Sequence, residues 1–366
     1  MKKGYALEKK EMTSLLVNAI TVKMLFSFPR SIVVKSGTAA WIQMIYMSLI
    51  TLIIFFLTVK VYEKAGMNNI VNIADKIGGR WLKIGIGIAL TVVLGLNMTV
   101  NMRFFPESVN AILLPETPME FILLLFAICI AFGAYMGIES IARVNAMFLP
   151  IAGLFLIGFL VLLIPHIQIT NMYPVLGTGT YNIFVRGWGE LRVFADIIVL
   201  NILLPFCKNR KQAISSGYRA IIISGIIGTL ISVMYVMIFP YPTSTEFLTP
   251  IYMMARLLRI GRYFQRLEAF FEFIWSIAML IYASLYLFAI CHVWKEMFNL
   301  RYIRPIIFPM VTLMVMLSLV PSSVVDLYQT NFITQWIIYP AAFTLPLVVG
   351  LLYRVKARRR KKLEKN

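Results

Sequence analysis

Two charged residues lie inside stretches of the chain that are otherwise apolar. Lys23 stands about eleven residues into the stretch 12–34, and Asp196 lies within the stretch 190–207. A charge at the centre of a membrane helix costs roughly 2.5 to 3.5 kcal/mol, so each charge needs a compensating partner. Asp196 is the natural partner of Lys23, and Glu272 is the other candidate. Lys23 is then either a fixed cation that replaces a coupling ion or takes up a proton, or one half of a buried structural pair.

Two asparagines, Asn97 and Asn101, are four residues apart in another apolar stretch. Residues at this spacing lie on one face of a helix. Asparagine side chains inside a membrane form hydrogen bonds between helices, so this pair either holds helices together or lines a cavity. Arg103 and Glu107 follow at the same spacing and predict an ion pair near the outer boundary of that helix.

Residue types that carry catalysis or bind metals are scarce. The chain has three cysteines, Cys129, Cys207 and Cys291, and two histidines that are far apart in the sequence. It contains no HExxH pair, no GxSxG elbow and no P-loop, which are motifs of metalloproteases, hydrolases and nucleotide-binding enzymes. We therefore expect no enzyme, no metal site and no cofactor, and we interpret the cysteines as free, packed thiols.

The composition defines the class of protein. Of the 366 residues, 60% are apolar and 14% are charged, and the mean hydropathy is +0.81. Soluble proteins have about 45 to 50% apolar and about 25% charged residues, so a soluble enzyme, a disordered chain and a disulfide scaffold are excluded. A helix needs roughly 20 apolar residues to cross a bilayer. The sequence predicts one polytopic membrane domain, 1–366, with ten spans at about 12–34, 39–61, 82–112, 119–138, 144–164, 190–207, 219–240, 268–292, 304–321 and 331–353.

The formal net charge of +19 is explained by membrane topology. With ten spans both termini lie on one side, and 25 of the Lys and Arg residues fall on that side against nine on the other. Basic residues are enriched in cytoplasmic segments, so we expect both termini in the cytoplasm. The basic tail 354–366 is expected to meet anionic headgroups of membrane lipids, and we assign no nucleic-acid partner to it.

The two spans that contain a charge are the first and the sixth, which are equivalent positions if the chain consists of two halves of five. Transporters built from inverted repeats place their substrate between discontinuous helices near the bilayer midplane. The pattern predicts an all-α integral membrane fold with ten transmembrane helices, arranged as a five-plus-five inverted repeat with broken first and sixth helices. The alternative is that the two helices pair a lysine with an aspartate for packing alone.

Four short motifs allow a comparison with a known family. They are Thr21-Val22-Lys23-Met24-Leu25-Phe26-Ser27-Phe28-Pro29-Arg30, Pro174-Val175-Leu176-Gly177-Thr178-Gly179, Arg103 with Glu107, and Arg266-Leu267-Glu268-Ala269-Phe270 with Trp275. In order and spacing they resemble the endospore germination permeases. These are the membrane-embedded B subunits of nutrient germinant receptors, a branch of the amino acid, polyamine and organocation transporter superfamily. The resemblance covers nearly the full chain.

This resemblance implies unwound first and sixth helices around an amino-acid-sized pocket. It also implies a nutrient sensor that works with an A subunit and a lipoprotein C subunit in the spore inner membrane. One departure concerns the break of the first helix. Many members of the wider superfamily have G-x-G there, with bare backbone amides that hold the ligand carboxylate, whereas this chain has Val22-Lys23-Met24. Lys23 is the candidate replacement for that positive site.

Three functions remain open from the sequence. The first is a receptor subunit that binds an amino acid or similar small nutrient between helices 1 and 6 and triggers germination. The second is a proton-coupled amino-acid permease that acts alone, and the third is an ion-conducting membrane scaffold. The candidate ligand-binding residues are Thr21, Val22, Lys23, Met24, Leu25, Asn97, Asn101, Phe194, Asp196, Ile197 and Glu272.

Overall fold

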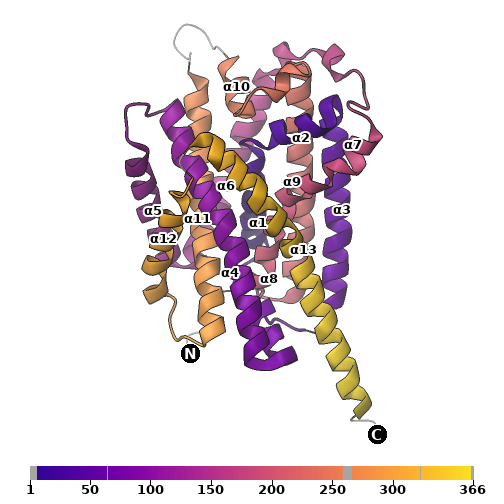
Figure 1. Cartoon of the computed structure of the whole chain (residues 1–366), viewed down its shortest axis with the longest axis vertical. Helices are drawn as coiled ribbons and strands as arrows, with labels where there is room; N and C mark the ends of the chain where they lie inside the picture. The colour runs from indigo at the N-terminus through magenta and orange to yellow at the C-terminus, as the bar shows by residue number, and fades with distance from the viewer. Residues whose placement is uncertain (1–5, 64, 259–265, 322, 364–366) are drawn as a thin grey trace.

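The computed structural model describes residues 6–63, 65–258, 266–321 and 323–363. These residues form a tall bundle of helices joined by loops (Figure 1). Helices dominate because the interior of a bilayer offers no hydrogen-bond partners, so a spanning segment must satisfy its backbone groups internally. Within the described residues, β-structure is limited to one isolated bridge between Leu7 and Cys207.

Seven helical stretches in the described part of the chain are long and apolar enough to cross a membrane. They contain α3 (Ala40–Val61), α4 (Ile70–Ile112), α5 (Met119–Met136), α6 (Ile138–Leu162), α9 (Arg210–Ile238), α11 (Leu267–Phe298) and α13 (Val324–Leu363). The chain is therefore a multi-pass membrane protein. The ninth predicted span is the shorter helix α12 (Arg304–Ser318), and the first and sixth consist of shorter pieces. The number of ten crossings therefore stays a prediction.

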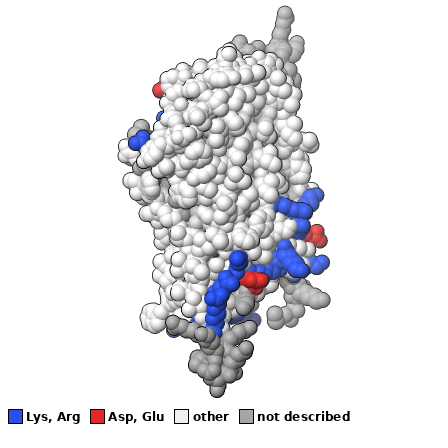
Figure 2. Space-filling view, turned by 90° about the vertical axis from the view of Figure 1, so that its right-hand side faces the viewer, with Lys and Arg blue, Asp and Glu red and all other residues white. Residues whose placement is uncertain are grey.

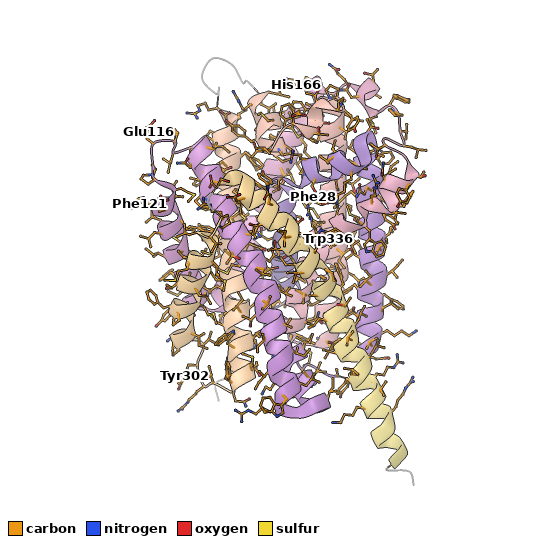
Figure 3. All side chains as sticks on the ribbon, in the orientation of Figure 1. Phe28, Glu116, Phe121, His166, Tyr302 and Trp336 are labelled. Atoms are coloured by element: carbon orange, nitrogen blue, oxygen red, sulfur yellow. The ribbon has the colours of Figure 1, made fainter. Side chains whose placement is uncertain are left out.

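The surface of the bundle agrees with this assignment. Large apolar side chains such as Phe121 and Trp336 lie on the outside of the bundle, with exposures of 54% and 62% (Figure 3). On the face shown in Figure 2 the middle of the molecule carries almost no charge, whereas Lys and Arg gather toward the lower end. We call this end, at which α1 begins and α13 ends, the basic end.

The first predicted span is interrupted. Helix α1 (Lys9–Met24) and helix α2 (Phe28–Ser36) are separated by three residues. Pro29 lies in the first turn of α2, where a missing N–H is tolerated because the first N–H groups of a helix have no intrahelical partner. Lys23 lies in the last turn of α1, and the partial negative charge at a helix C-terminus favours a cation there.

The sixth predicted span is not a regular α-helix either. It consists of the 3-10 segment η4 (Arg186–Ile198), the short α8 (Val199–Leu203) and the single turn η5 (Leu204–Phe206), which contains Pro205. Runs of 3-10 helix beyond three or four residues are uncommon and often mark a hinge. The structure thus confirms the prediction that the first and sixth helices are irregular.

Neighbouring helices enclose the interrupted ones. Helix α1 packs against α9, α6 and η4, while α4 packs along α11 and α13. Of the seven apolar stretches in the described residues, the one in α11 is 72% buried and the one that contains α6 is 11% buried. We infer that α11 is a central helix of the bundle, whereas α6 presents most of its apolar surface to lipid.

Helix α4 is longer than the predicted span 82–112. It begins at Ile70 because the Asn69 side chain caps it, accepting a hydrogen bond from the backbone N–H of Asn72 at 2.8 Å. Asparagine is a favoured N-cap residue for this reason. A kink at Gly79, where φ is 68°, then separates the first turns from the long apolar part.

The basic tail predicted at 354–366 is not separate from the last span. Helix α13 continues through this region to Leu363, because Lys and Arg are good helix formers. The Lys356 ammonium donates a hydrogen bond to the carbonyl of Ile77 at 2.8 Å. The extension of α13 therefore contacts the start of α4, and residues 364–366 lie outside the described residues.

A loop that precedes η4 is docked on the far end of α2. A Cβ atom at Gly177, where φ is 50°, would lie 1.9 Å from the carbonyl oxygen of Ser36, so only glycine fits. The neighbouring Thr178 hydroxyl donates a hydrogen bond to the carbonyl of Lys35 at 2.6 Å. The motif Pro174-Val175-Leu176-Gly177-Thr178-Gly179 thus holds the end of α2 that is distant from Lys23.

Candidate functional site

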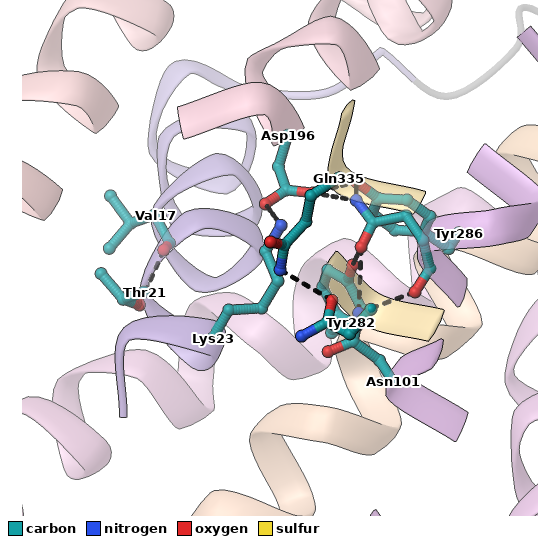
Figure 4. Close-up of polar contacts among 10 residues, drawn as sticks. Val17, Thr21, Lys23, Asn101, Asp196, Tyr282, Tyr286 and Gln335 are labelled. Carbon is teal, nitrogen blue, oxygen red and sulfur yellow. Dashed lines mark hydrogen bonds and ion pairs between the residues drawn. The ribbon is translucent and has the colours of Figure 1, made fainter. Parts of the chain in front are cut away.

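The two intramembrane charges meet in the structure. The Lys23 ammonium lies 2.5 Å from Oδ2 of Asp196, so an ion pair joins the last turn of α1 to η4 (Figure 4). The Asp196 side chain is completely buried, whereas that of Lys23 is 18% exposed. Of the two partners that the sequence offered to Lys23, the structure selects Asp196. Glu272 instead accepts a hydrogen bond from the Ser108 hydroxyl.

Neutral polar side chains surround the Asp196 carboxylate. Its Oδ1 accepts hydrogen bonds from the Tyr286 hydroxyl and from Nδ2 of Asn97, the latter at 3.1 Å. Asn97 accepts in turn from the Tyr282 hydroxyl at 3.1 Å and from Nδ2 of Asn101 at 2.9 Å (Figure 4). The network joins η4 to α4 and α11, and it satisfies polar groups whose burial would otherwise be costly.

A cavity of about 80 Å³ adjoins the Lys23 side chain. This volume holds more than one water molecule. Its wall combines cationic, amide and aromatic groups from the helix break and from η4, α4, α11 and α13. The lining residues are Lys23, Phe26, Ser27, Phe28, Asn97, Val100, Asn101, Phe104, Arg192, Val193, Trp275, Asn331, Gln335 and Ile338. Ligand sites typically combine apolar surface with a few polar groups in this way.

Aromatic rings form the apolar side of the cavity and also stabilise the break. Phe26 stacks on Trp275 with ring centroids 5.2 Å apart, and it approaches Phe104 at 5.4 Å. Nε1 of Trp275 donates a hydrogen bond to the carbonyl of Val22 at 2.9 Å. Because the last carbonyls of a helix have no intrahelical partner, Trp275 satisfies a group that the end of α1 leaves unpaired.

Like Asp196, the other residues predicted to bind ligand do not line this cavity, and Glu272 is one of them. Three line a separate, mostly apolar cavity between α1, α6 and α11, and these are Thr21, Val22 and Leu25. Three more are buried in the hydrophobic core, and these are Met24, Phe194 and Ile197. The structure brings together Lys23, Asp196, Asn97 and Asn101.

Eleven of the fourteen residues that line the cavity were missing from the predicted set, among them Arg192, Trp275, Asn331 and Gln335. Asn331 and Gln335 come from α13, where Nε2 of Gln335 donates a hydrogen bond to Oδ1 of Asn331 at 2.8 Å (Figure 4). They are four residues apart, the spacing that pointed to the asparagines of α4, so the sequence did contain this signal. Trp275 entered only through a family motif. Arg192 gave no signal because it stands near the start of a predicted span, where a basic residue is ordinary.

A second ion cluster joins the interrupted helices and reaches the cavity through Arg192. The buried Glu190 carboxylate pairs with Lys35 at 2.8 Å and with Arg192 at 2.9 Å. Arg192 also donates a hydrogen bond to the Ser31 hydroxyl at 2.7 Å. The cluster holds α2 to η4, just as the ion pair of Lys23 with Asp196 holds α1 to η4, and each contact contributes one cation, Arg192 or Lys23, to the cavity wall.

The fold and the site define a membrane protein of the transporter-fold class. Among solved structures, the chain is similar to Mhp1, a nucleobase-cation-symport-1 family transporter in a closed conformation with bromovinylhydantoin bound. The TM-score is 0.69 at 11% identity, and the match covers 97% of this chain and 92% of that chain. It is also similar to MhsT in complex with L-phenylalanine, with a TM-score of 0.67 at 13% identity and coverage of 97% and 96%. These likenesses support the predicted transporter fold.

The family follows from the sequence comparison. Residues 6–325 match the family model described as spore germination protein, and the chain belongs to this family. Similar proteins of Bacillus subtilis (strain 168) include spore germination protein A2, which is 21% identical over 350 residues that cover 94% of each chain. Spore germination protein YndE is 23% identical over 72% of this chain and 73% of its own length. The resemblance drawn from the short motifs is confirmed.

A further relative from the same organism, putative spore germination protein YfkT, is 27% identical over 197 residues. That match covers 51% of this chain and 52% of YfkT, so the chain spans about half the length of this relative. The relatives are spore germination proteins, and the structural neighbour Mhp1 is a transporter. Among the residues that the structure describes, no group of three or more His, Cys, Asp or Glu side chains is placed to hold a metal ion.

Proposed function

We propose that the protein is the membrane subunit of a spore nutrient germinant receptor. It binds an amino acid or similar small nutrient between helices 1 and 6, and binding triggers germination without a catalytic step. The observation that carries this proposal is the ion pair of Lys23 with Asp196, which joins both interrupted helices beside a cavity. A ligand that contacts both helices can bind one arrangement of them more tightly than another. It then shifts the equilibrium between the two arrangements by the difference between its two binding free energies.

The cavity wall suits an amino acid. Lys23 and Arg192 supply two cations for a carboxylate, and charge-assisted hydrogen bonds of this kind are strong. The stack of Phe26 on Trp275, together with Phe104, supplies an apolar surface for a side chain. MhsT was solved with L-phenylalanine and Mhp1 with bromovinylhydantoin, which supports a small organic ligand by analogy of fold.

The setting of the receptor is part of the proposal. The protein lies in the inner membrane of the spore, both termini are cytoplasmic, and it acts with an A subunit and a lipoprotein C subunit. The excess of Lys and Arg at the basic end supports the orientation (Figure 2), and membership of the spore germination protein family supports the location and the partners. Genes for A and C subunits next to this gene would favour the receptor, and an isolated gene would favour a permease.

Ligand-dependent thermal stabilisation tests the binding step. The full-length protein in neutral detergent is heated with each common amino acid, and a ligand at 100 times its Kd stabilises the folded state by about 2.7 kcal/mol. Lys23→Met should abolish the shift in Tm. Arg143→Met removes an exposed cation of α6 and should preserve the shift. If no compound stabilises the wild type, or if Lys23→Met responds equally, the proposed site is wrong.

The transporter fold makes a proton-coupled permease the second candidate. Uptake into proteoliposomes under a pH gradient separates the two functions. Concentrative uptake of the stabilising compound by this protein alone would favour the permease, whereas binding without uptake would favour the receptor. Conductance of the reconstituted protein in the absence of nutrient would indicate an ion-conducting scaffold instead. Spores that carry Lys23→Met should lose their germination response if the receptor proposal holds.

A further inference from the structure

A cavity of about 560 Å³ opens at the basic end of the bundle, on the side of α1. It is formed where the beginnings of α1 and α9 meet the first half of α6. It shares no lining residue with the cavity beside Lys23. The cavity therefore lies outside the site proposed for the nutrient, although it borders the same broken helix.

The mouth of this cavity is strongly basic. Four cationic side chains line it, Lys9, Lys10, Lys208 and Arg219, against one acidic residue, Glu8. Glu8 is the N-cap of α1 and so lies at the positive end of that helix. Within the described residues, none of the four cations forms an ion pair with a carboxylate. Their mutual repulsion would be relieved by an anion that binds among them.

The inner part of the cavity is apolar. Val17, Leu149, Pro150 and Ile223 contribute to its wall. Ile223 lies thirteen residues beyond the start of α9, which corresponds to a depth of about 20 Å at 1.5 Å per residue. The cavity therefore reaches from the charged end of the helices into the depth at which a bilayer is hydrocarbon.

The neighbouring face of α6 continues this apolar wall. Met147, Ile151 and Leu154 follow one another along α6 and are 75%, 62% and 72% exposed. An occupant with apolar chains could run along this face, whereas a small anion such as phosphate would use only the cationic mouth. Residues 1–5 of the chain include Lys2 and Lys3. This segment is positively charged, so the cationic mouth would repel it and it is not a suitable occupant of the cavity.

We propose that this cavity binds an anionic phospholipid. The headgroup phosphate lies among Lys9, Lys208 and Arg219, and the acyl chains extend along α6 and α9. Basic pockets between membrane helices bind anionic headgroups by this combination of charge and apolar depth. Because the Ser216 hydroxyl of α9 donates to the carbonyl of Lys9 at 3.1 Å, the lipid binds at a point where α1 and α9 already touch. It therefore stabilises α1 in the position that the structure shows.

Thermal unfolding and native mass spectrometry of the full-length protein in neutral detergent test the proposal. The probes are dioleoylphosphatidylglycerol, dioleoylphosphatidylcholine, glycerol 3-phosphate and inorganic phosphate. We expect phosphatidylglycerol to raise Tm and to remain bound in the mass spectrum, and the other three to do neither. Equal stabilisation by phosphatidylcholine would refute the need for an anion. Equal stabilisation by either soluble phosphate would show a free-anion site and would overturn the lipid assignment.

Paired variants identify the site. Lys208→Gln combined with Arg219→Gln removes two cations of the mouth and should weaken phosphatidylglycerol binding about 25-fold, or about fivefold per cation. The matched control, Lys295→Gln combined with Arg301→Gln, removes two cations that do not line the cavity and should change binding less than twofold. Equal losses in both pairs would show nonspecific attraction and refute the site.

A third variant covers the case in which loss of charge disturbs folding. Ala146→Trp leaves every cation in place and fills the cavity from α6, where Ala146 lines the wall. We expect it to fold with a Tm close to that of the wild type in detergent and to lose the stabilisation by phosphatidylglycerol. Retained stabilisation in this variant would place the lipid elsewhere and would overturn the proposal.

Discussion

Replacement of Lys23 by methionine tests whether the charges at the helix break act as one unit. The change keeps a long, flexible side chain but removes the ammonium, and it leaves Asp196 completely buried with neutral donors from Tyr286 and Asn97. The reverse change, Asp196→Asn, leaves a lysine that is 18% exposed and can reach water in the cavity. We therefore expect Lys23→Met to be the more destabilising of the two.

The size of the effect follows from the geometry. At 2.5 Å and an effective dielectric constant of about 20, two unit charges attract each other by about 7 kcal/mol, and desolvation cancels several kcal/mol per ion. Loss of one partner from a buried pair costs about 3 to 5 kcal/mol because the other charge is left uncompensated. With an unfolding entropy of about 2.1 cal/mol/K per residue and 366 residues, Tm should fall by about 4 to 7 °C.

The assay is thermal unfolding of the wild type, both single variants and the Lys23→Met/Asp196→Asn double variant in one detergent, which forms a double-mutant cycle. The double variant should be more stable than Lys23→Met, because no unpaired charge remains. Arg143→Met is the matched control, since it removes a cation from an exposed pair with Glu139 and should change the free energy of unfolding by less than about 1 kcal/mol.

Two results would refute this reasoning. If Lys23→Met lowered Tm no more than Arg143→Met, the ammonium would not compensate a buried charge. If the effects of the two single variants were strictly additive in the double variant, Lys23 and Asp196 would not interact in the folded protein. Either outcome would also remove the physical basis for a ligand that acts on both interrupted helices.

Three further substitutions probe the elements around the site, each measured by thermal unfolding against the wild type. Gly177→Ala should destabilise the protein by more than about 1 kcal/mol, because the alanine Cβ would collide with the Ser36 carbonyl oxygen. Trp275→Phe should cost about 1 to 3 kcal/mol, since the Val22 carbonyl loses its donor; an unchanged Tm would show that water replaces the indole. Glu190→Gln should cost about 3 to 5 kcal/mol because two paired cations lose their carboxylate, and additivity with Lys23→Met would show that the two ion clusters are independent.

The interrupted helices were predictable because membranes tolerate few charges. A lysine and an aspartate in apolar spans must find partners, so Lys23 and Asp196 indicated both the special helices and their contact. The early start of α4 and the continuation of α13 were not predictable in the same way. They depend on the Asn69 cap and on charged helix formers outside the membrane, where hydropathy carries no signal.

The sequence by itself determined the class of protein, the apolar helices and the charges inside them, because these depend on residue type and on the cost of burying charge in lipid. It left Asp196 and Glu272 open as partners of Lys23, and the structure selected Asp196. Only the tertiary structure decided which side chains share the cavity. Thr21 and Leu25 are neighbours of Lys23 in the sequence but line a different cavity, since successive residues of a helix point in different directions. Arg192 and Gln335 reach the cavity from segments far apart in the chain, and the packing of η4 and α13 brings them there.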